Sequence, residues 1–286
     1  MILVIGAGGR NGRAVLAELV TRGYGEQIVA ATRKPESLAD TGVRTVVFDW
    51  QCPETYASCV DGAQLMYLIA PERMPGMPER AHELLEHAVA AGVRQVVFLS
   101  AMGVQDRADL PLRKVERSVM NLCGDWTLLR PNWFMQNFSS GLFRAGIADR
   151  DEIVAPAGHA GVSFVDVRDI AASAATVLAD PAASNHRTYT LTGSAALTFR
   201  EVAEMLTAAT GRPIRYQELD PQDPALLAKM GIPGRRPEPV RALFDRVRAG
   251  LEAKLTDDVA MLTGRPPITF PAFAVAHVDS WLPPGQ

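Results

Sequence analysis

A glycine-rich turn close to the start of the chain constrains the fold more than any other feature. The apolar run MILVIGA at residues 1–7 is typical of a buried strand, and the segment VIGAGGRNGRAV at residues 4–15 leads from it into a helical pattern. Four residues of this turn are glycines: Gly6, Gly8, Gly9 and Gly12. Without Cβ atoms, the backbone N–H groups of such a turn are open to a pyrophosphate. The positive end of a helix starting near Gly12 favours the same anion.

We therefore predict a dinucleotide site that contains these glycines together with the intervening Arg10 and Asn11. A tight turn between strand and helix without a ligand is the alternative. The complete β-α-β pattern that follows along the chain argues against that alternative.

The end of the next predicted strand, QIVAATR at residues 27–33, indicates which dinucleotide binds. Sheets that bind NAD usually carry an acid there for the ribose hydroxyls, whereas this strand ends in Arg33 and is followed by Lys34. A guanidinium binds a 2′-phosphate through a charge-assisted pair, and a carboxylate would repel it. NADP, in its reduced form NADPH, is the predicted cofactor, and Arg10 adds positive charge at the same end. Solvated loop charges are the alternative role of Arg33 and Lys34.

Asp49 and Trp50 close the third predicted strand, VRTVVFDW at residues 43–50. A carboxylate at this position can accept a hydrogen bond from the adenine amino group, with the indole beside the ring. Asp49 is equally well explained as a turn residue, and both interpretations stay open.

Strands and helices alternate through the first half of the chain. Further apolar runs, LMYLIAP at residues 65–71 and RQVVFLS at residues 94–100, show no alternation of polar residues, which is typical of a sheet covered on both faces. Apolar side chains recur at helical spacing in the two intervening segments: Val15, Leu16, Leu19 and Val20 in the first, and Ala81, Leu84, Leu85, Ala88 and Val89 in the second. This order predicts an α/β fold of the Rossmann type, with a doubly wound parallel sheet and right-handed crossovers.

The second half of the chain is less regular. WTLLRP at residues 126–131 reads as a strand that Pro131 ends, and Thr198 with Glu201 forms a capping box before a helix. We expect a nucleotide-binding domain at residues 1–195 and a smaller α-rich C-terminal region at residues 196–286 that covers a substrate.

Composition narrows the class of protein. The 286 residues carry a net charge of −3, so no charge excess indicates a nucleic-acid or anionic-membrane partner. The apolar runs are too short to span a membrane, and three cysteines without metal spacing suit a reducing cytoplasm. His82 and His87 are five residues apart and diverge around a helix, so no metal site is expected. The expected partner is a small-molecule substrate, and the chain is expected to be a monomer or a homodimer.

Three further segments carry a family resemblance: LLRPNWFMQNF at residues 128–138, SFVDVRDIA at residues 163–171 and YTLTGSAALTFREVAEML at residues 189–206. Together with the Gly6-x-x-Gly9-x-x-Gly12 spacing and Arg33, they make the chain resemble the NmrA-like atypical short-chain dehydrogenases along nearly its whole length. Within this family it resembles the branch of type 2 NADPH quinone reductases, triphenylmethane dye reductases and ergot-type iminium reductases. It also resembles redox-sensing regulators that bind NADP without turning it over.

The resemblance implies further site residues. The nucleotide would lie along the strand ends as well as the glycine loop, with the nicotinamide near Pro131 and Asn132. Cofactor residues implied in this way are Ala70, Pro71, Ser100, Ala101, Pro131, Asn132 and Phe134. Substrate residues implied in this way are Met102, Trp133, Phe134 and Asn137. From the residues alone, Trp133, Phe134 and Phe138 would more often be core side chains.

A proton donor is missing from the pattern. No tyrosine precedes a lysine at the Tyr-x-x-x-Lys spacing of the short-chain dehydrogenases, and Leu110 stands four residues before Lys114. The position of the lysine in the related benzylic ether and isoflavone reductases corresponds to Leu112. An ordinary ketone needs a proton at its developing alkoxide, whereas a quinone, an iminium ion or a cationic dye is already electrophilic. We therefore predict hydride transfer from NADPH to such an acceptor, with unknown catalytic side chains. A non-catalytic NADP sensor is the alternative, and an epimerase or dehydratase is a weaker third.

Overall fold

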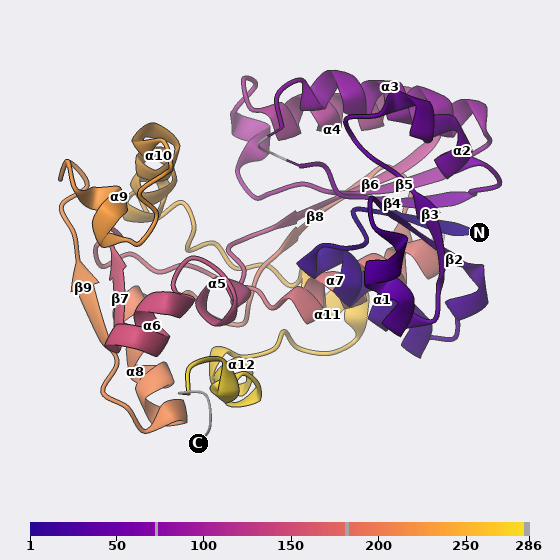
Figure 1. The fold of residues 1–286 in the computed structure, drawn as a ribbon. Helices are drawn as coiled ribbons and strands as arrows, with labels where there is room; N and C mark the ends of the chain where they lie inside the picture. Colours follow the sequence, from indigo (N-terminus) through magenta and orange to yellow (C-terminus); the bar gives the residue numbers. More distant parts are fainter. Residues whose placement is uncertain (72–73, 181–182, 283–286) are drawn as a thin grey trace. The chain divides into compact units, whose positions relative to one another are not determined.

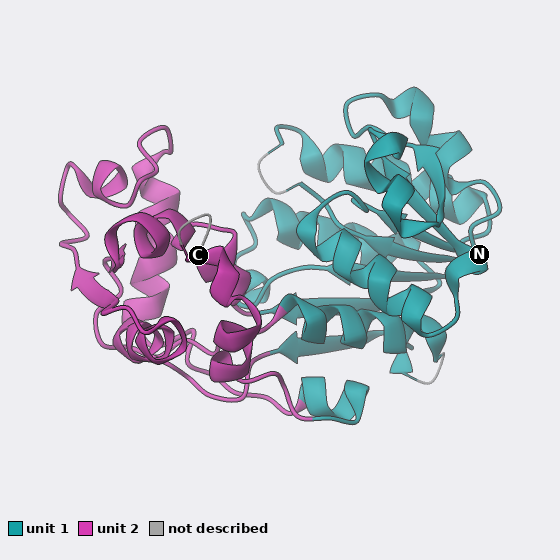
Figure 2. Ribbon diagram, turned by 60° about the horizontal axis from the view of Figure 1, so that its bottom comes forward, with its two compact units in different colours: residues 1–131, 167–191, 258–265 teal, residues 132–166, 192–257, 266–286 magenta. Residues whose placement is uncertain are grey.

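The computed structural model describes residues 1–71, 74–180 and 183–282. It divides into two compact units that interleave along the chain (Figure 2). Unit 1 comprises residues 1–131, 167–191 and 258–265, and unit 2 comprises residues 132–166, 192–257 and 266–286. The predicted division into residues 1–195 and 196–286 stays a prediction, because compact units alone do not define functional domains.

A seven-stranded parallel sheet forms the centre of unit 1, with the strand order β3-β2-β1-β4-β5-β6-β8. Its strands are β1 (Ile2–Ile5), β2 (Ile28–Thr32), β3 (Arg44–Val47), β4 (Leu65–Leu68), β5 (Gln95–Leu99), β6 (Asp125–Pro131) and β8 (Arg187–Leu191). The strand order reverses between β1 and β4, which makes this the switch point of a doubly wound sheet. The predicted Rossmann-type fold is confirmed.

Helices cover both faces of this sheet: α2, α3 and α4 lie on one side, and α1, α7 and α11 lie on the other (Figure 1). The helices of unit 1 are α1 (Arg10–Thr21), α2 (Tyr56–Val60), α3 (Met77–Ala90), α4 (Pro111–Leu122), α7 (Val167–Ala179) and α11 (Asp258–Thr263). Short 3₁₀ helices are η1 (Gly25–Gln27), η2 (Pro35–Thr41), η3 (Pro53–Thr55) and η4 (Val104–Asp106). Because both faces are covered, every residue of β1 and β5 is buried.

Two details of the helices differ from the sequence prediction. Helix α1 begins at Arg10 rather than near Gly12, so Asn11 and Gly12 belong to its first turn. Val20 and Val89 are 40% and 41% exposed, although the apolar stripe placed them on buried faces. Both lie at the margin of their stripe, beyond the side chains that contact the sheet.

Unit 2 holds a two-stranded parallel sheet and short helices around an aromatic core. Its strands are β7 (Glu152–Ala155) and β9 (Arg215–Glu218). Its helices are α5 (Gln136–Ser139), α6 (Arg144–Arg150), α8 (Phe199–Thr210), α9 (Leu226–Lys229), α10 (Pro237–Arg248), α12 (Phe270–Ala276) and the 3₁₀ helix η6 (Val278–Ser280). The predicted capping box of Thr198 and Glu201 starts α8. Phe138 lies at the centre of the core, with its ring centroid 5.0 Å from Phe143 and 5.2 Å from Phe164.

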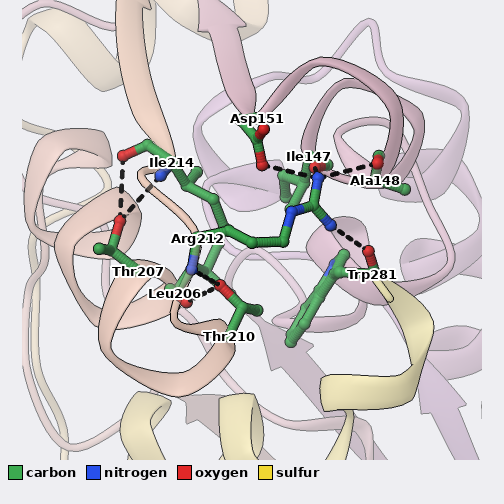
Figure 3. A network of polar contacts seen from close by, with 9 residues as sticks. All are labelled: Ile147, Ala148, Asp151, Leu206, Thr207, Thr210, Arg212, Ile214 and Trp281. Carbon is green, nitrogen blue, oxygen red and sulfur yellow. Dashed lines mark hydrogen bonds and ion pairs between the residues drawn. The ribbon is translucent and has the colours of Figure 1, made fainter. Parts of the chain in front are cut away.

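Arg212 ties three segments of unit 2 together (Figure 3). Its guanidinium donates to the carbonyl oxygens of Ile147 at 3.1 Å and Ala148 at 2.9 Å, which lie in the last turn of α6, and pairs with Asp151 at 2.6 Å. It also donates to the carbonyl oxygen of Trp281. The contact attaches the C-terminal segment to α6, because Trp281 is fully buried and its indole N–H donates to the Phe138 carbonyl at 2.8 Å.

Candidate cofactor site

The glycine loop connects β1 to α1, and its glycines have different roles. Gly6 has a φ of +79°, and a Cβ there would lie 2.9 Å from the Cβ of Ile69. Gly8 and Gly9 are exposed, and the Gly9 N–H donates to the Gly6 carbonyl at 3.1 Å, which closes the turn. A Cβ on Gly12 would lie 2.3 Å from the Gly6 carbonyl oxygen. Gly12 is therefore required by the packing of α1 on its own loop, whereas Gly8 and Gly9 leave the backbone open to a ligand.

A cleft of about 740 Å³ opens beside this loop within unit 1. Its lining includes eight residues predicted to bind the cofactor: Gly6, Gly8, Gly9, Arg33, Lys34, Asp49, Trp50 and Pro71. Thr32, Ser37, Phe48, Gln51 and Met74 also line it, and no feature of the sequence had selected them. The volume falls within the range of small-molecule and cofactor sites.

Basic side chains stand at one end of the cleft. Arg33 and Lys34 follow β2 directly and are exposed. Arg33 forms no hydrogen bond or ion pair within the described part of the chain, so its guanidinium is available to an anion. Arg13, by contrast, pairs with Asp40 at 3.2 Å. Partial burial lowers the pKa of Arg10, which starts α1 and does not line the cleft.

Asp49 and Trp50 also line the cleft. The Asp49 carboxylate accepts a hydrogen bond from the Gln51 N–H at 2.9 Å, which makes it a turn residue as well as a lining residue. The Trp50 carbonyl accepts hydrogen bonds from the Tyr56 hydroxyl at 2.9 Å and from Arg80 at 3.1 Å. These bonds fix the backbone at Trp50, and the role of the indole beside an adenine stays a prediction.

Asn11 lies behind the loop rather than in the cleft. Its side chain is 7% exposed and accepts a hydrogen bond from the Tyr67 hydroxyl at 2.6 Å, while its Nδ2 has no partner within the described residues. Burial raises the pKa of Tyr67 above its ordinary value. The pair joins the first turn of α1 to β4, so Asn11 contributes through the placement of that turn.

The residues predicted at the ends of β4, β5 and β6 form a second group in unit 1. Ala70 is buried, Ala101 and Met102 are half-buried, and the Met102 N–H donates to the Pro131 carbonyl at 3.0 Å. Ser100 is 5% exposed, and its hydroxyl donates to the Glu116 carboxylate at 2.6 Å. Among these residues and Pro71, only Pro71 lines the cleft, and the nicotinamide roles of the others stay predictions.

Glu116 is the residue here that sequence reasoning missed. It is fully buried and accepts two hydrogen bonds from Arg130, at 2.7 and 2.8 Å, and one from Arg113 at 2.7 Å. Burial opposes its ionisation, but the bonds from Arg130, Ser100 and Arg113 outweigh it and lower the pKa of Glu116. Lys114, two residues earlier on the same helix, is exposed, whereas Glu116 is buried. The i,i+3 spacing of Arg113 and Glu116 was the available signal.

The remaining predicted residues belong to unit 2. Asn132 is 4% exposed and its side-chain amide is fully engaged: it donates to Ser163 Oγ at 2.7 Å and to the Glu252 carbonyl at 2.8 Å, and accepts from the Trp133 N–H. The Trp133 ring lies 5.4 Å from that of Phe244 within the aromatic core. Phe134 and Asn137 are half-buried, and the Asn137 N–H donates to the Phe134 carbonyl at 3.0 Å. Their substrate and cofactor roles stay predictions.

No helix in residues 1–71, 74–180 and 183–282 is long and apolar enough to cross a membrane. Within the same part of the chain, no three His, Cys, Asp or Glu side chains are grouped as metal ligands.

The fold and the cleft together define a dinucleotide-binding protein of the Rossmann type, with two exposed cations, Arg33 and Lys34, in the lining of the cleft. The chain belongs to the NmrA-like family, whose profile matches residues 1–241. The family predicted from the sequence is therefore confirmed.

Two of the similar proteins are named as reductases. The chain is 31% identical over 289 residues to the NAD(P)H azoreductase of Xenophilus azovorans, a match that covers 98% of this chain and 99% of the relative. It is 33% identical over 296 residues to the (4-alkanoyl-5-oxo-2,5-dihydrofuran-3-yl)methyl phosphate reductase of Streptomyces griseus, covering 99% of this chain and 100% of the relative. Among solved structures, the NADPH complex of the quinone oxidoreductase QOR2 from Escherichia coli is similar, with a TM-score of 0.83 and 25% identity, covering 98% of this chain and 100% of that chain.

Proposed function

We propose that this protein is an NADPH-dependent reductase that transfers hydride to an electrophilic small organic acceptor, such as a quinone, an iminium ion or a dye. The observation that carries the proposal is the exposed Arg33, which has no partner among the described residues and lies next to an open glycine loop in one cleft. A cation in this position favours a nucleotide with a 2′-phosphate over one without it.

The cleft residues fit NADPH, which when bound supplies the hydride. The N–H groups of Gly8 and Gly9 and the start of α1 would hold the pyrophosphate, since no Cβ shields them. Arg33 and Lys34 would hold the 2′-phosphate, and Asp49 with Trp50 would hold the adenine. These side chains bind and orient the cofactor, which is how a protein contributes most to hydride transfer.

Two features favour an electrophilic acceptor over an ordinary ketone. Leu112, at the position of a lysine in related reductases, is apolar and 7% exposed, so it donates no proton. The similar proteins reduce an azo dye, a quinone and an unsaturated furan derivative according to their names. Acceptors of this kind accept hydride at an electron-poor centre, and alignment supplies most of the catalysis.

We further propose a cytoplasmic location, since Cys52, Cys59 and Cys123 are all free thiols, and a monomer or homodimer without nucleic-acid or membrane partners. In the proposed domain organisation, residues 1–195 serve the nucleotide and residues 196–286 cover the substrate.

Consumption of NADPH, followed optically against a panel of quinones, cationic dyes, azo dyes and cyclic iminium ions, tests the proposal. NADH in parallel controls for cofactor preference. Turnover with NADPH preferred supports the reductase, and the responding acceptor defines the substrate class. Tight NADPH binding without turnover across the panel would instead support the non-catalytic sensor, and equal use of NADH would overturn the assignment of Arg33.

A further inference from the structure

A cluster of charged residues lies at the carboxyl edge of the sheet in unit 1, outside the cleft. Ser100 follows the last residue of β5, and Arg130 precedes the last residue of β6. Helix α4 follows β5 along the chain, so its first turns, with Arg113 and Glu116, belong to the same edge. Nucleotides bind at the carboxyl edge of open parallel sheets.

Glu116 is saturated with hydrogen bonds. Its Oε1 accepts from Ser100 Oγ at 2.6 Å and from Arg130 Nε at 2.7 Å, and its Oε2 accepts from Arg130 Nη2 at 2.8 Å and Arg113 Nη1 at 2.7 Å. A buried carboxylate held by two guanidinium groups remains ionised.

The cluster nevertheless carries more positive than negative charge. Two guanidinium groups face one carboxylate, and neither Arg113 nor Arg130 forms another ion pair within the described residues. The side chains of Arg113 and Arg130 are only 20% and 13% exposed, so water screens their charge incompletely. Nε of Arg113 is buried without a hydrogen-bond partner in the described part of the chain. The cluster by itself therefore carries a net charge of +1.

We propose that the Arg113–Glu116–Arg130 cluster makes the protein bind NADPH more tightly than NADP⁺. The inference rests on the proposed function and on the predicted position of the nicotinamide near Pro131, the residue that follows Arg130. The two nucleotides differ in the ring, which is neutral in NADPH and carries a positive charge in NADP⁺. A net positive charge in a partly buried setting repels the oxidised ring and leaves the reduced ring unaffected.

The direction of this preference suits a reductase. Loss of hydride converts the neutral ring into a cation beside the cluster. The oxidised cofactor therefore dissociates more readily than the reduced cofactor, which favours its replacement by NADPH. A unit charge acting through a partly screened environment should change the ratio of the two dissociation constants by about three- to tenfold.

Calorimetric titration of the full-length protein with NADPH and with NADP⁺ measures that ratio directly. Arg113→Met removes the excess charge and should reduce the preference for NADPH by about three- to tenfold. Arg113→Lys keeps the charge and should retain the preference. Arg117→Met removes an exposed cation from the same helix and serves as the matched control, with an unchanged ratio expected.

Glu116→Gln supplies a second test with the opposite sign. The substitution makes the net charge of the cluster more positive, so the preference for NADPH should increase. A general loss of order in the site would instead weaken the binding of both nucleotides equally. If Arg113→Met binds both nucleotides with an unchanged ratio of dissociation constants, the inference is wrong and the proposed reductase function is unaffected. Failure of the unmodified protein to bind either nucleotide would overturn the proposed function itself.

Discussion

The carbonyl oxygen of Gly6 lies 2.3 Å from the position that a Cβ on Gly12 would occupy. The first turn of α1 packs directly on the loop that precedes it, and no side chain fits between them. The third glycine of the pattern is thus a packing requirement, while Gly9, with a Cβ position 3.4 Å from the same oxygen, has room for a side chain.

Gly12→Ala should therefore lower the free energy of unfolding by about 3 kcal/mol, because helix or loop must move to admit the methyl group. Urea unfolding measures the effect. Gly25→Ala is the matched control, since a Cβ at Gly25 meets no atom within 4 Å. Equal stability of the two variants would show that α1 adjusts without cost.

Gly9→Ala should have the complementary effect. Its backbone φ of −79° is accessible to alanine, so we expect the protein to fold with nearly unchanged stability. The new methyl group would stand where a pyrophosphate approaches the loop, and NADPH affinity should fall at least about tenfold. If a fluorescence titration shows an unchanged NADPH affinity, the pyrophosphate does not lie against Gly9.

Arg33→Ala should weaken NADPH binding by about ten- to a hundredfold, since a charge-assisted contact contributes about 1.5–3 kcal/mol. NADH has no 2′-phosphate, so its affinity should stay within about twofold, and this comparison is the internal control. A parallel loss for both nucleotides would instead indicate that Arg33 shapes the loop.

Arg212→Ala should destabilise the protein by about 2–4 kcal/mol, because it leaves the carbonyls of Ile147 and Ala148 without their donor and Asp151 without its cation. Chemical denaturation provides the measurement. Arg200→Ala removes an exposed arginine from α8 and should change stability by no more than about 0.5 kcal/mol. If the two substitutions prove equivalent, the contacts of Arg212 contribute nothing net.

The carboxyl group of Glu252 should make the free energy of unfolding depend on pH. Burial raises the pKa of this carboxyl group, and the ion pair with Arg246 at 2.7 Å offsets only part of that rise. The folded state therefore holds the proton more tightly than the unfolded state does. This stabilisation is complete below the ordinary pKa of 4.5 and is lost as the pH rises through the folded value.

The stability of the wild type relative to Glu252→Gln should accordingly decline from pH 4 towards neutrality, by the linkage relation. Glu116 has a lowered pKa and gives the opposite sign: its contribution is present at neutral pH and is lost as the pH falls. Chemical unfolding of Glu252→Gln and Glu116→Gln between pH 4 and neutrality, each compared with the wild type, measures how the stability difference changes with pH. The two differences should change in opposite directions, and a change in the same direction would contradict the pKa shifts of Glu252 and Glu116.

The sequence by itself determined the class of fold and predicted one end of the site. Unbroken apolar runs indicated a sheet covered on both faces, and the position of Arg33 after β2 indicated a phosphate site, because such features depend on a few neighbouring residues. Gly8, Gly9 and Trp50 line the cleft because they follow the ends of neighbouring parallel strands, and their contacts with the cofactor stay predictions.

Only the tertiary structure decided how distant side chains pair. Glu116 meets Ser100 and Arg130 from positions 16 and 14 residues away, and the Asn132 amide is bound by the carbonyl of Glu252, 120 residues further along the chain. A buried polar group must find a partner, but sequence periodicity records only that a position is buried or exposed. Which partner it finds depends on the segments that folding brings together, and at Glu116 that choice leaves the positive charge from which the nucleotide preference was inferred.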